Sequence, residues 1–296
     1  MNDYGQSGSG VTPLDALVLG GGGPVGVAWT SGMLFGLESA GLPLSESGLV
    51  VGTSAGSVAG AWLTMDQPGL QALPGLMQKR AAWHAKNAGA GLGDRSLLRR
   101  LAGGGPDDPD RAVRIGRAAI AAIPPISVDE AEHLWEQALP TGPFPPQLRI
   151  VAVNAETGAA RGWSASDNIP LGVAVSCSTA APGAAPPVTV AGSVWIDGGV
   201  RSGTNADLLL DPDWAALPAD SSPGRVLVLA PMPSEALARE QAALAEHGHH
   251  VRVIVAEPFY ETPLDLLDPR FVDIAAAAGT NQAKDISDDL ANWWNQ

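Results

Sequence analysis

Residues 49–57 read Leu49-Val50-Val51-Gly52-Thr53-Ser54-Ala55-Gly56-Ser57, an apolar run that breaks into small residues. The apolar start predicts a short buried strand, and the residues from Ala55 to about Met65 predict a helix. A serine with a glycine two positions away on each side fits a sharp strand-to-helix turn, in which the serine backbone is strained and its hydroxyl is exposed. Ser54 is therefore a candidate nucleophile, although an ordinary glycine turn would have the same pattern.

A second apolar run, Leu14 to Leu19, ends in Gly20-Gly21-Gly22-Gly23-Pro24 and is followed by a predicted helix from Val25 to Ala40. With the strand at Leu49 this makes a βαβ unit, which predicts a parallel sheet with functional loops at its carboxyl edge. Consecutive glycines can turn backbone N–H groups inward to bind an anion, as an oxyanion hole requires.

The same glycines also fit a dinucleotide fingerprint, Gly-x-Gly-x-x-Gly. That fold needs an acidic residue at the end of the second strand to bind the ribose, and this chain has Gly52-Thr53-Ser54 there. The dinucleotide interpretation is therefore disfavoured, while a purely structural glycine turn stays open.

A third motif, Trp195-Ile196-Asp197-Gly198-Gly199, places an acid at the end of a predicted strand. Asp before Gly is most often a tight turn. Within hydrogen-bond reach of a serine, however, a shielded carboxylate can take the hydroxyl proton directly, so Asp197 is a candidate base.

These three motifs, in this order, resemble the patatin-like phospholipase family over about residues 14 to 210. The resemblance implies that Ser54 is the nucleophile, Asp197 its dyad partner, and Gly22 and Gly23 the amide donors to the oxyanion. It also implies that no cofactor is needed. The block from Ser176 to Pro182 is similar to a family block near the site, to which we assign no chemistry.

The chain departs from the family at Val25, where the family usually has Arg or Lys. Backbone donors survive this change, so ester hydrolysis is still expected. A missing cation argues against recognition of a phosphate head group, and we expect neutral esters to be preferred over diacyl phospholipids.

The histidines offer two alternatives near the carboxyl half of the chain. His247, His249 and His250 follow Asp197, so a Ser, Asp, His triad has a permitted chain order. They also form a cluster that could bind a metal, but no carboxylate or cysteine is spaced to complete a site. We expect a solvated loop there and assign no metal.

Composition limits the class of protein. The chain has 296 residues and a net charge of -14, which argues against nucleic acid as a partner. The single cysteine, Cys177, excludes an internal disulfide framework, and the polar start lacks the pattern of a signal peptide. The cytoplasm is the expected compartment, with peripheral membrane contact left open and the oligomeric state unknown.

Together these patterns predict a three-layer α/β/α fold with a mostly parallel central sheet. We expect one domain over 1–296, with a disordered tail at 1–13 and a helical insertion or cap at 66–146. Later strands are expected near Leu148 to Asn154, Arg161 to Trp163, Val188 to Val190, Ser193 to Ile196, Val226 to Ala230 and Val251 to Val255.

The predicted function is a serine acyl hydrolase that cleaves carboxylic esters of lipids through a Ser54 and Asp197 dyad. The alternative is a non-catalytic protein that keeps the fold and binds an acyl chain or a partner.

Overall fold

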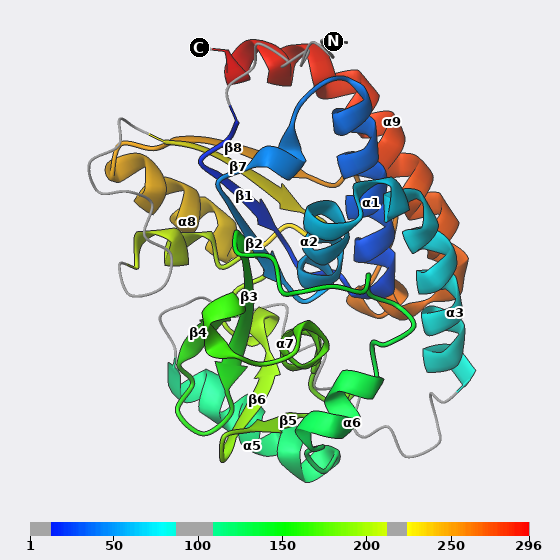
Figure 1. Ribbon diagram of the computed structural model, residues 1–296, viewed down its shortest axis with the longest axis vertical. Coiled ribbons are helices and arrows are strands. Elements are labelled where there is room, and N and C mark those ends of the chain that lie inside the picture. The colour runs from blue at the N-terminus through cyan, green and yellow to red at the C-terminus, as the bar shows by residue number, and fades with distance from the viewer. Residues whose placement is uncertain (1–12, 87–108, 212–223, 296) are drawn as a thin grey trace, which may run out of the picture.

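The computed structural model describes residues 13–86, 109–211 and 224–295 (Figure 1). Its centre is one eight-stranded sheet in the order β5-β6-β3-β2-β1-β7-β8, with β4 paired to β3 off this path. The strands are β1 (Ala16–Leu19), β2 (Leu49–Thr53), β3 (Leu148–Asn154), β4 (Ala160–Trp163), β5 (Val188–Val190), β6 (Ser193–Asp197), β7 (Arg225–Ala230) and β8 (His250–Val255). Five neighbouring strands are parallel to one another, namely β3, β2, β1, β7 and β8. The other three, β4, β5 and β6, join the sheet through antiparallel pairs.

Helices cover both faces of the sheet, so the fold has three layers. One face carries α1 (Gly23–Ser39), α2 (Ala55–Met65), α3 (Leu73–Lys86), α7 (Leu171–Ser178) and α9 (Val272–Trp294). The other carries α5 (Pro109–Ala122) and α8 (Glu235–Glu246), and α8 lies to the left of the strands in Figure 1. A short helix, α6 (Val128–His133), packs against α7.

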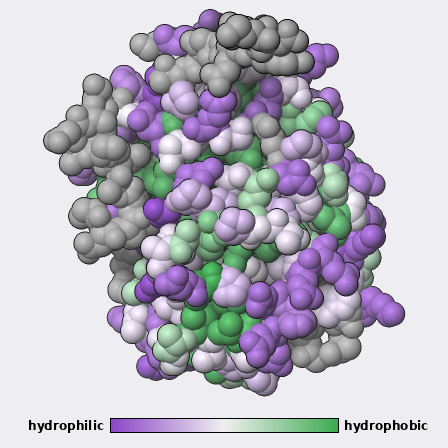
Figure 2. Space-filling model, viewed as in Figure 1, coloured by the Kyte–Doolittle hydropathy of each residue, from purple (hydrophilic) through white to green (hydrophobic). Residues whose placement is uncertain are grey.

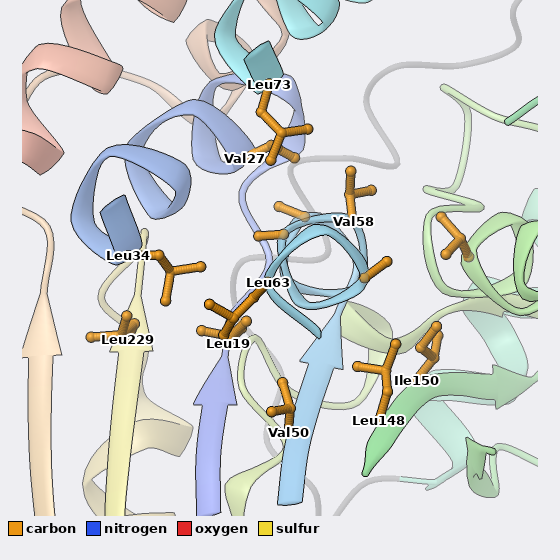
Figure 3. Close-up of a cluster of buried hydrophobic side chains, with 14 of the residues drawn as sticks. Leu19, Val27, Leu34, Val50, Val58, Leu63, Leu73, Leu148, Ile150 and Leu229 are labelled. Atoms are coloured by element: carbon orange, nitrogen blue, oxygen red, sulfur yellow. The ribbon is translucent and has the colours of Figure 1, made fainter. Parts of the chain in front are cut away.

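The strands are apolar on both faces because both faces are covered. Leu17 and Leu19 of β1 pack against the helices α1 and α2, whereas Ala16 and Val18 pack toward α8. Figure 3 shows Leu19, Val50 and Leu229 pointing from three neighbouring strands toward the helical layer. Continuous burial on both faces is typical of parallel sheets.

The three-layer α/β architecture predicted from the sequence is confirmed. The helix expected from Ala55 to Met65 and the strand from Leu148 to Asn154 have the predicted bounds. The sequence also predicts a final helix from Pro269 to Trp294; the helix begins later, at Val272, because Asp268 caps a separate 3-10 turn at Pro269–Phe271. Within the expected insertion, the sequence predicts a helix from Asp129 to Leu139; this helix ends at His133 and continues only as turns.

The region predicted as a helical insertion, 66–146, contains α3, α5 and α6 in its described part. Residues 87–108 within it, and residues 1–12 of the predicted tail, lie outside the described residues. The single domain and its boundaries stay predictions.

Most side chains on the face shown in Figure 2 are hydrophilic, with hydrophobic ones gathered toward its lower half. Large apolar side chains with substantial exposure are Trp83, Leu134 and Ile274. Within the described ranges, no helix is both long and apolar enough to cross a membrane.

Candidate active site

Ser54 occupies a strained turn between β2 and α2. Its φ of 51° and ψ of -113° lie in a region that residues with a side chain rarely adopt. The turn aims the half-buried Ser54 into a cavity, directly before the first residue of α2. The amino end of a helix favours developing negative charge, so the location suits a nucleophile.

The glycines on either side of Ser54 make room for this turn. A Cβ on Gly56 would lie 2.0 Å from the carbonyl oxygen of Leu19, and a Cβ on Gly52 would lie 2.6 Å from the carbonyl oxygen of Gly56. Both contacts are with backbone, which cannot move aside easily. The Gly-x-Ser-x-Gly spacing is therefore a steric requirement of the close approach of β1, β2 and α2.

Asp197 reaches Ser54 because two strands end side by side. Along β3, Thr53 of β2 pairs with Val151, and Asp197 of β6 pairs with Ala152, the next residue. β4 pairs with residues 150–153 of β3, a range that overlaps the residues paired with β2 and those paired with β6. β4 therefore lies along one edge of β3, and β2 and β6 both lie along the other edge. β2 is parallel to β3 and β6 is antiparallel to it, so their carboxyl ends meet. Residues 143 positions apart in the sequence thereby come into contact.

The two side chains form a hydrogen bond in which Ser54 Oγ donates to Asp197 Oδ2 at 2.8 Å. The other carboxylate oxygen, Oδ1, accepts from the backbone N–H of Gly199 at 2.7 Å. Asp197 is only 3% exposed, and burial raises its pKa from 3.8 to about 6, while the hydrogen bonds from Gly199 and Ser54 oppose that rise. At neutral pH the carboxylate is therefore mostly ionised, and it is a stronger base than an exposed aspartate.

The glycine loop lies at the other side of Ser54. Gly20 and Gly21 are anchored by their N–H groups, which donate to the carbonyl oxygens of Leu229 and Gly203 at 2.9 and 2.8 Å. In the described part of the chain, the amides of Gly22 and Gly23 donate to no other residue. Both line the cavity with Ser54, and Gly23 opens α1 with a φ of 60°. The amino ends of α1 and α2 thus converge on the space beside the serine hydroxyl.

Ser178 fixes the backbone of the turn. Its hydroxyl accepts from the Ser54 N–H at 2.8 Å and donates to the Val151 carbonyl oxygen at 2.6 Å. Ser178 belongs to the block Ser176 to Pro182, which the sequence placed near the site without a role. Its contacts give that block a positioning function.

A buried polar network supports the loop that follows Asp197. Glu240 of α8 accepts hydrogen bonds from the hydroxyls of Ser202 and Thr204 and from the N–H of Ala206. Burial raises the pKa of Glu240, because its carboxylate is removed from water. Asn205 continues the network to the Thr53 hydroxyl and the Gly198 carbonyl oxygen. No sequence motif marked these residues.

The cavity beside Ser54 and Asp197 has a volume of about 290 Å³. Its lining includes Ser54, Asp197 and the glycine loop on one side and Met77, Arg80 and Trp135 on another. This volume is close to the lower end of the range for small-molecule sites, about 300 to 1,000 Å³. Val25, in contrast, is fully buried in the core between the helices and is not part of the lining.

The histidine alternative places its candidates at the far end of α8. Ser234 and Glu235, at the start of this helix, line the cavity, whereas His247 caps its end. Twelve helical residues span about 18 Å at 1.5 Å each. No histidine is among the described residues that line the cavity, so the geometry favours a dyad over a triad. Within the same ranges, no group of three His, Cys, Asp or Glu side chains is arranged to hold a metal ion.

The chain is similar to known proteins of one described family and to a solved structure. The family model described as patatin-like phospholipase matches residues 17–210. Among solved structures, the chain is similar to VipD from Legionella pneumophila, with 16% sequence identity and a TM-score of 0.49. That similarity covers 94% of this chain and 67% of VipD. No curated protein matched the chain.

Proposed function

The chain belongs to the patatin-like phospholipase family, and on that premise we propose that it hydrolyses carboxylic esters of lipids through a Ser54 and Asp197 dyad. Membership supports lipid acyl hydrolase activity in general. The finer assignment rests on one observation above all, the 2.8 Å hydrogen bond between Ser54 Oγ and the buried carboxylate of Asp197 beside a cavity.

In the proposed reaction, Asp197 takes the hydroxyl proton of Ser54 while Ser54 Oγ attacks the acyl carbonyl carbon. The carbonyl oxygen becomes an oxyanion, which the Gly22 and Gly23 amides stabilise. The tetrahedral intermediate collapses, the ester C–O bond breaks, and Asp197 returns its proton to the leaving alcohol. An acyl group is then esterified to Ser54.

Water completes the cycle by the same route. Asp197 accepts a proton from the water that attacks the acyl-enzyme, a second oxyanion forms at the same amides, and the proton passes to Ser54 Oγ as the acid leaves. The Asp197 pKa of about 6 suits this double use, because the group is ionised at neutral pH and yet basic enough to accept a proton.

The direct test is Ser54→Ala. We expect loss of nearly all ester hydrolysis and of labelling by a fluorophosphonate probe, which reacts with an activated serine hydroxyl. The protein should stay folded, since alanine is smaller than serine. Ser39→Ala is the matched control, because Ser39 is an exposed serine at the end of α1 and should not affect labelling. Full hydrolysis by Ser54→Ala would refute the proposal, and a native protein that binds acyl chains without labelling would support the non-catalytic alternative.

A further inference from the structure

The cavity next to Ser54 has a single positive side chain in the described part of the chain, that of Arg80. The acidic side chains of Asp197 and Glu235 also line it. The whole chain has a net charge of -14, so an anionic substrate is repelled overall and would gain from a local cation. Arg80 therefore determines whether the cavity can accept a negative group.

Arg80 is held firmly and yet keeps most of its donors available. It lies on α3 one turn after Met77, which lines the same cavity. Its guanidinium stacks on the buried ring of Trp135, with Cζ 3.7 Å from the ring centroid. One nitrogen, Nη1, donates to the Leu134 carbonyl oxygen at a long 3.4 Å. A guanidinium has five N–H donors in a rigid plane, and stacking leaves the edges of that plane free to donate.

No carboxylate among the described residues forms an ion pair with Arg80. Arginines elsewhere in the structure do have such partners, for example Arg201 with Asp207. Burial lowers the pKa of Arg80 to about 10, so the side chain stays charged at neutral pH while it lacks an acid to offset its loss of water. An anion in the cavity would supply that compensation.

From this arrangement we propose that Arg80 is the specificity-determining residue that binds a phosphate group of the ester substrate. The inference rests on the proposed hydrolysis at Ser54 and adds the residue of this chain that would recognise a phosphate on the ester substrate. A planar fork of donors matches phosphate oxygens better than a point charge does. Arg80 supplies the cation that the sequence lacks at position 25, and it does so from a different segment. The preference for neutral esters expected from Val25 therefore does not follow from the structure.

The test compares two substrates that differ only in the phosphate, monooctanoylglycerol and monooctanoylglycerol phosphate. The measured quantity is the ratio of their kcat/KM values, in which effects common to both substrates cancel. Arg80→Gln should lower the ratio of kcat/KM for the phosphate ester to kcat/KM for the neutral ester by about tenfold to a hundredfold. This is the effect expected when one hydrogen bond to a charged group is lost. Arg80→Lys keeps the charge without the fork and should give an intermediate ratio. Lys79→Gln is the control, because Lys79 is an exposed cation on the same helix outside the cavity lining, and it should leave the ratio unchanged.

Binding is measured separately, so that failure of the hydrolysis proposal can be recognised. In the Ser54→Ala protein, octyl phosphate should raise the melting temperature, and the added substitution Arg80→Gln should abolish that rise. Inactivity toward both esters together with this Arg80-dependent binding would refute the hydrolysis and leave the anion site supported. If Arg80→Gln does not fold, Arg80→Lys takes its place in the test. The stabilisation of the Ser54→Ala protein by octyl phosphate can still be measured in that case.

Two results would overturn the inference. One is a ratio that stays within twofold of the native value in a folded Arg80→Gln protein. The other is equal stabilisation by inorganic phosphate and octyl phosphate at the same concentration, which would mean that the site takes a free anion rather than the phosphate of a lipid ester.

Discussion

Asp197→Asn should abolish catalysis and, at neutral pH, make the protein more stable. Asparagine has nearly the same shape as aspartate, and its oxygen can still accept from the Gly199 N–H. What changes is the charge. The folded protein must keep an ionised carboxylate at a position that is 3% exposed, whereas the unfolded chain leaves that carboxylate in water.

The size and the pH dependence of the effect follow from the two pKa values. Below pH 3.8, Asp197 is protonated in both states and costs nothing. Between 3.8 and about 6, the unfolded chain releases the proton while the folded protein keeps it, so the stability of the native protein falls as pH rises. Above about 6, the cost is constant at about 3 kcal/mol, from 1.36 kcal/mol for each pH unit of that interval. The asparagine side chain never ionises, so the Asp197→Asn variant escapes this loss.

The assay is urea unfolding followed by tryptophan fluorescence at a series of pH values from 4 to 8. The difference in unfolding free energy, variant minus native, should increase by about 2.5 kcal/mol between pH 4 and pH 7, because a small part of the loss is already present at pH 4. Asp288→Asn is the matched control, because Asp288 is exposed on α9 and the same substitution there removes no buried charge. A difference for Asp197→Asn that is constant across the series would refute the reasoning that burial governs this carboxylate.

Three further outcomes are expected. In the native protein, kcat/KM should fall as pH drops below about 6, since the base must be ionised; a rate that is flat down to pH 4 would contradict the role of Asp197. Ser178→Ala should lower kcat about tenfold and cost about 1 to 3 kcal/mol of stability, because it leaves the buried N–H of Ser54 without its acceptor; kinetics and urea unfolding measure the two effects, and unchanged values in both would argue against positioning by Ser178. Val25→Arg should destabilise the fold by several kcal/mol, about 3 or more, because position 25 is fully buried; a stable variant with a tenfold shift toward phospholipids would instead restore position 25 as the reader of the head group.

The layers and most helices and strands could be predicted from the sequence, because in those segments the local sequence patterns agree with the folded structure. Glycine runs mark the ends of β1 and β2, and apolar blocks of the right length mark strands buried on both faces. The hairpin of β5 and β6 also follows from its alternation and from the Ala191-Gly192 turn, where both residues have positive φ. These features depend only on neighbours in the chain.

The arrangement of the site depends on contacts between distant segments, which single-sequence reasoning does not provide. The motifs named Ser54 and Asp197, but only the antiparallel placement of β6 beside the end of β2 explains their contact. Arg80 belongs to a helix whose own pattern says nothing about a cavity, and only its folded position beside Trp135 and Met77 places it at the site. Val25 was assigned an influence on the head group from its position in a motif; its side chain is fully buried and lies outside the cavity lining, and the preference for neutral esters stays a prediction.

The shared attachment of both strands to β3 has a consequence for thermal motion. Thr53 pairs with Val151, Asp197 pairs with Ala152, and the Ser178 hydroxyl that holds Ser54 also donates to Val151. Ser54 and Asp197 are therefore both attached to the same two residues of one strand. When thermal motion deforms the sheet, Ser54 and Asp197 should be displaced together. The distance between the two side chains should then fluctuate less than the position of either residue. Correlated displacement of this kind would keep the 2.8 Å distance from Ser54 Oγ to Asp197 Oδ2 short enough for proton transfer, even though Ser54 lies in a strained turn and Asp197 is 143 residues away in the sequence.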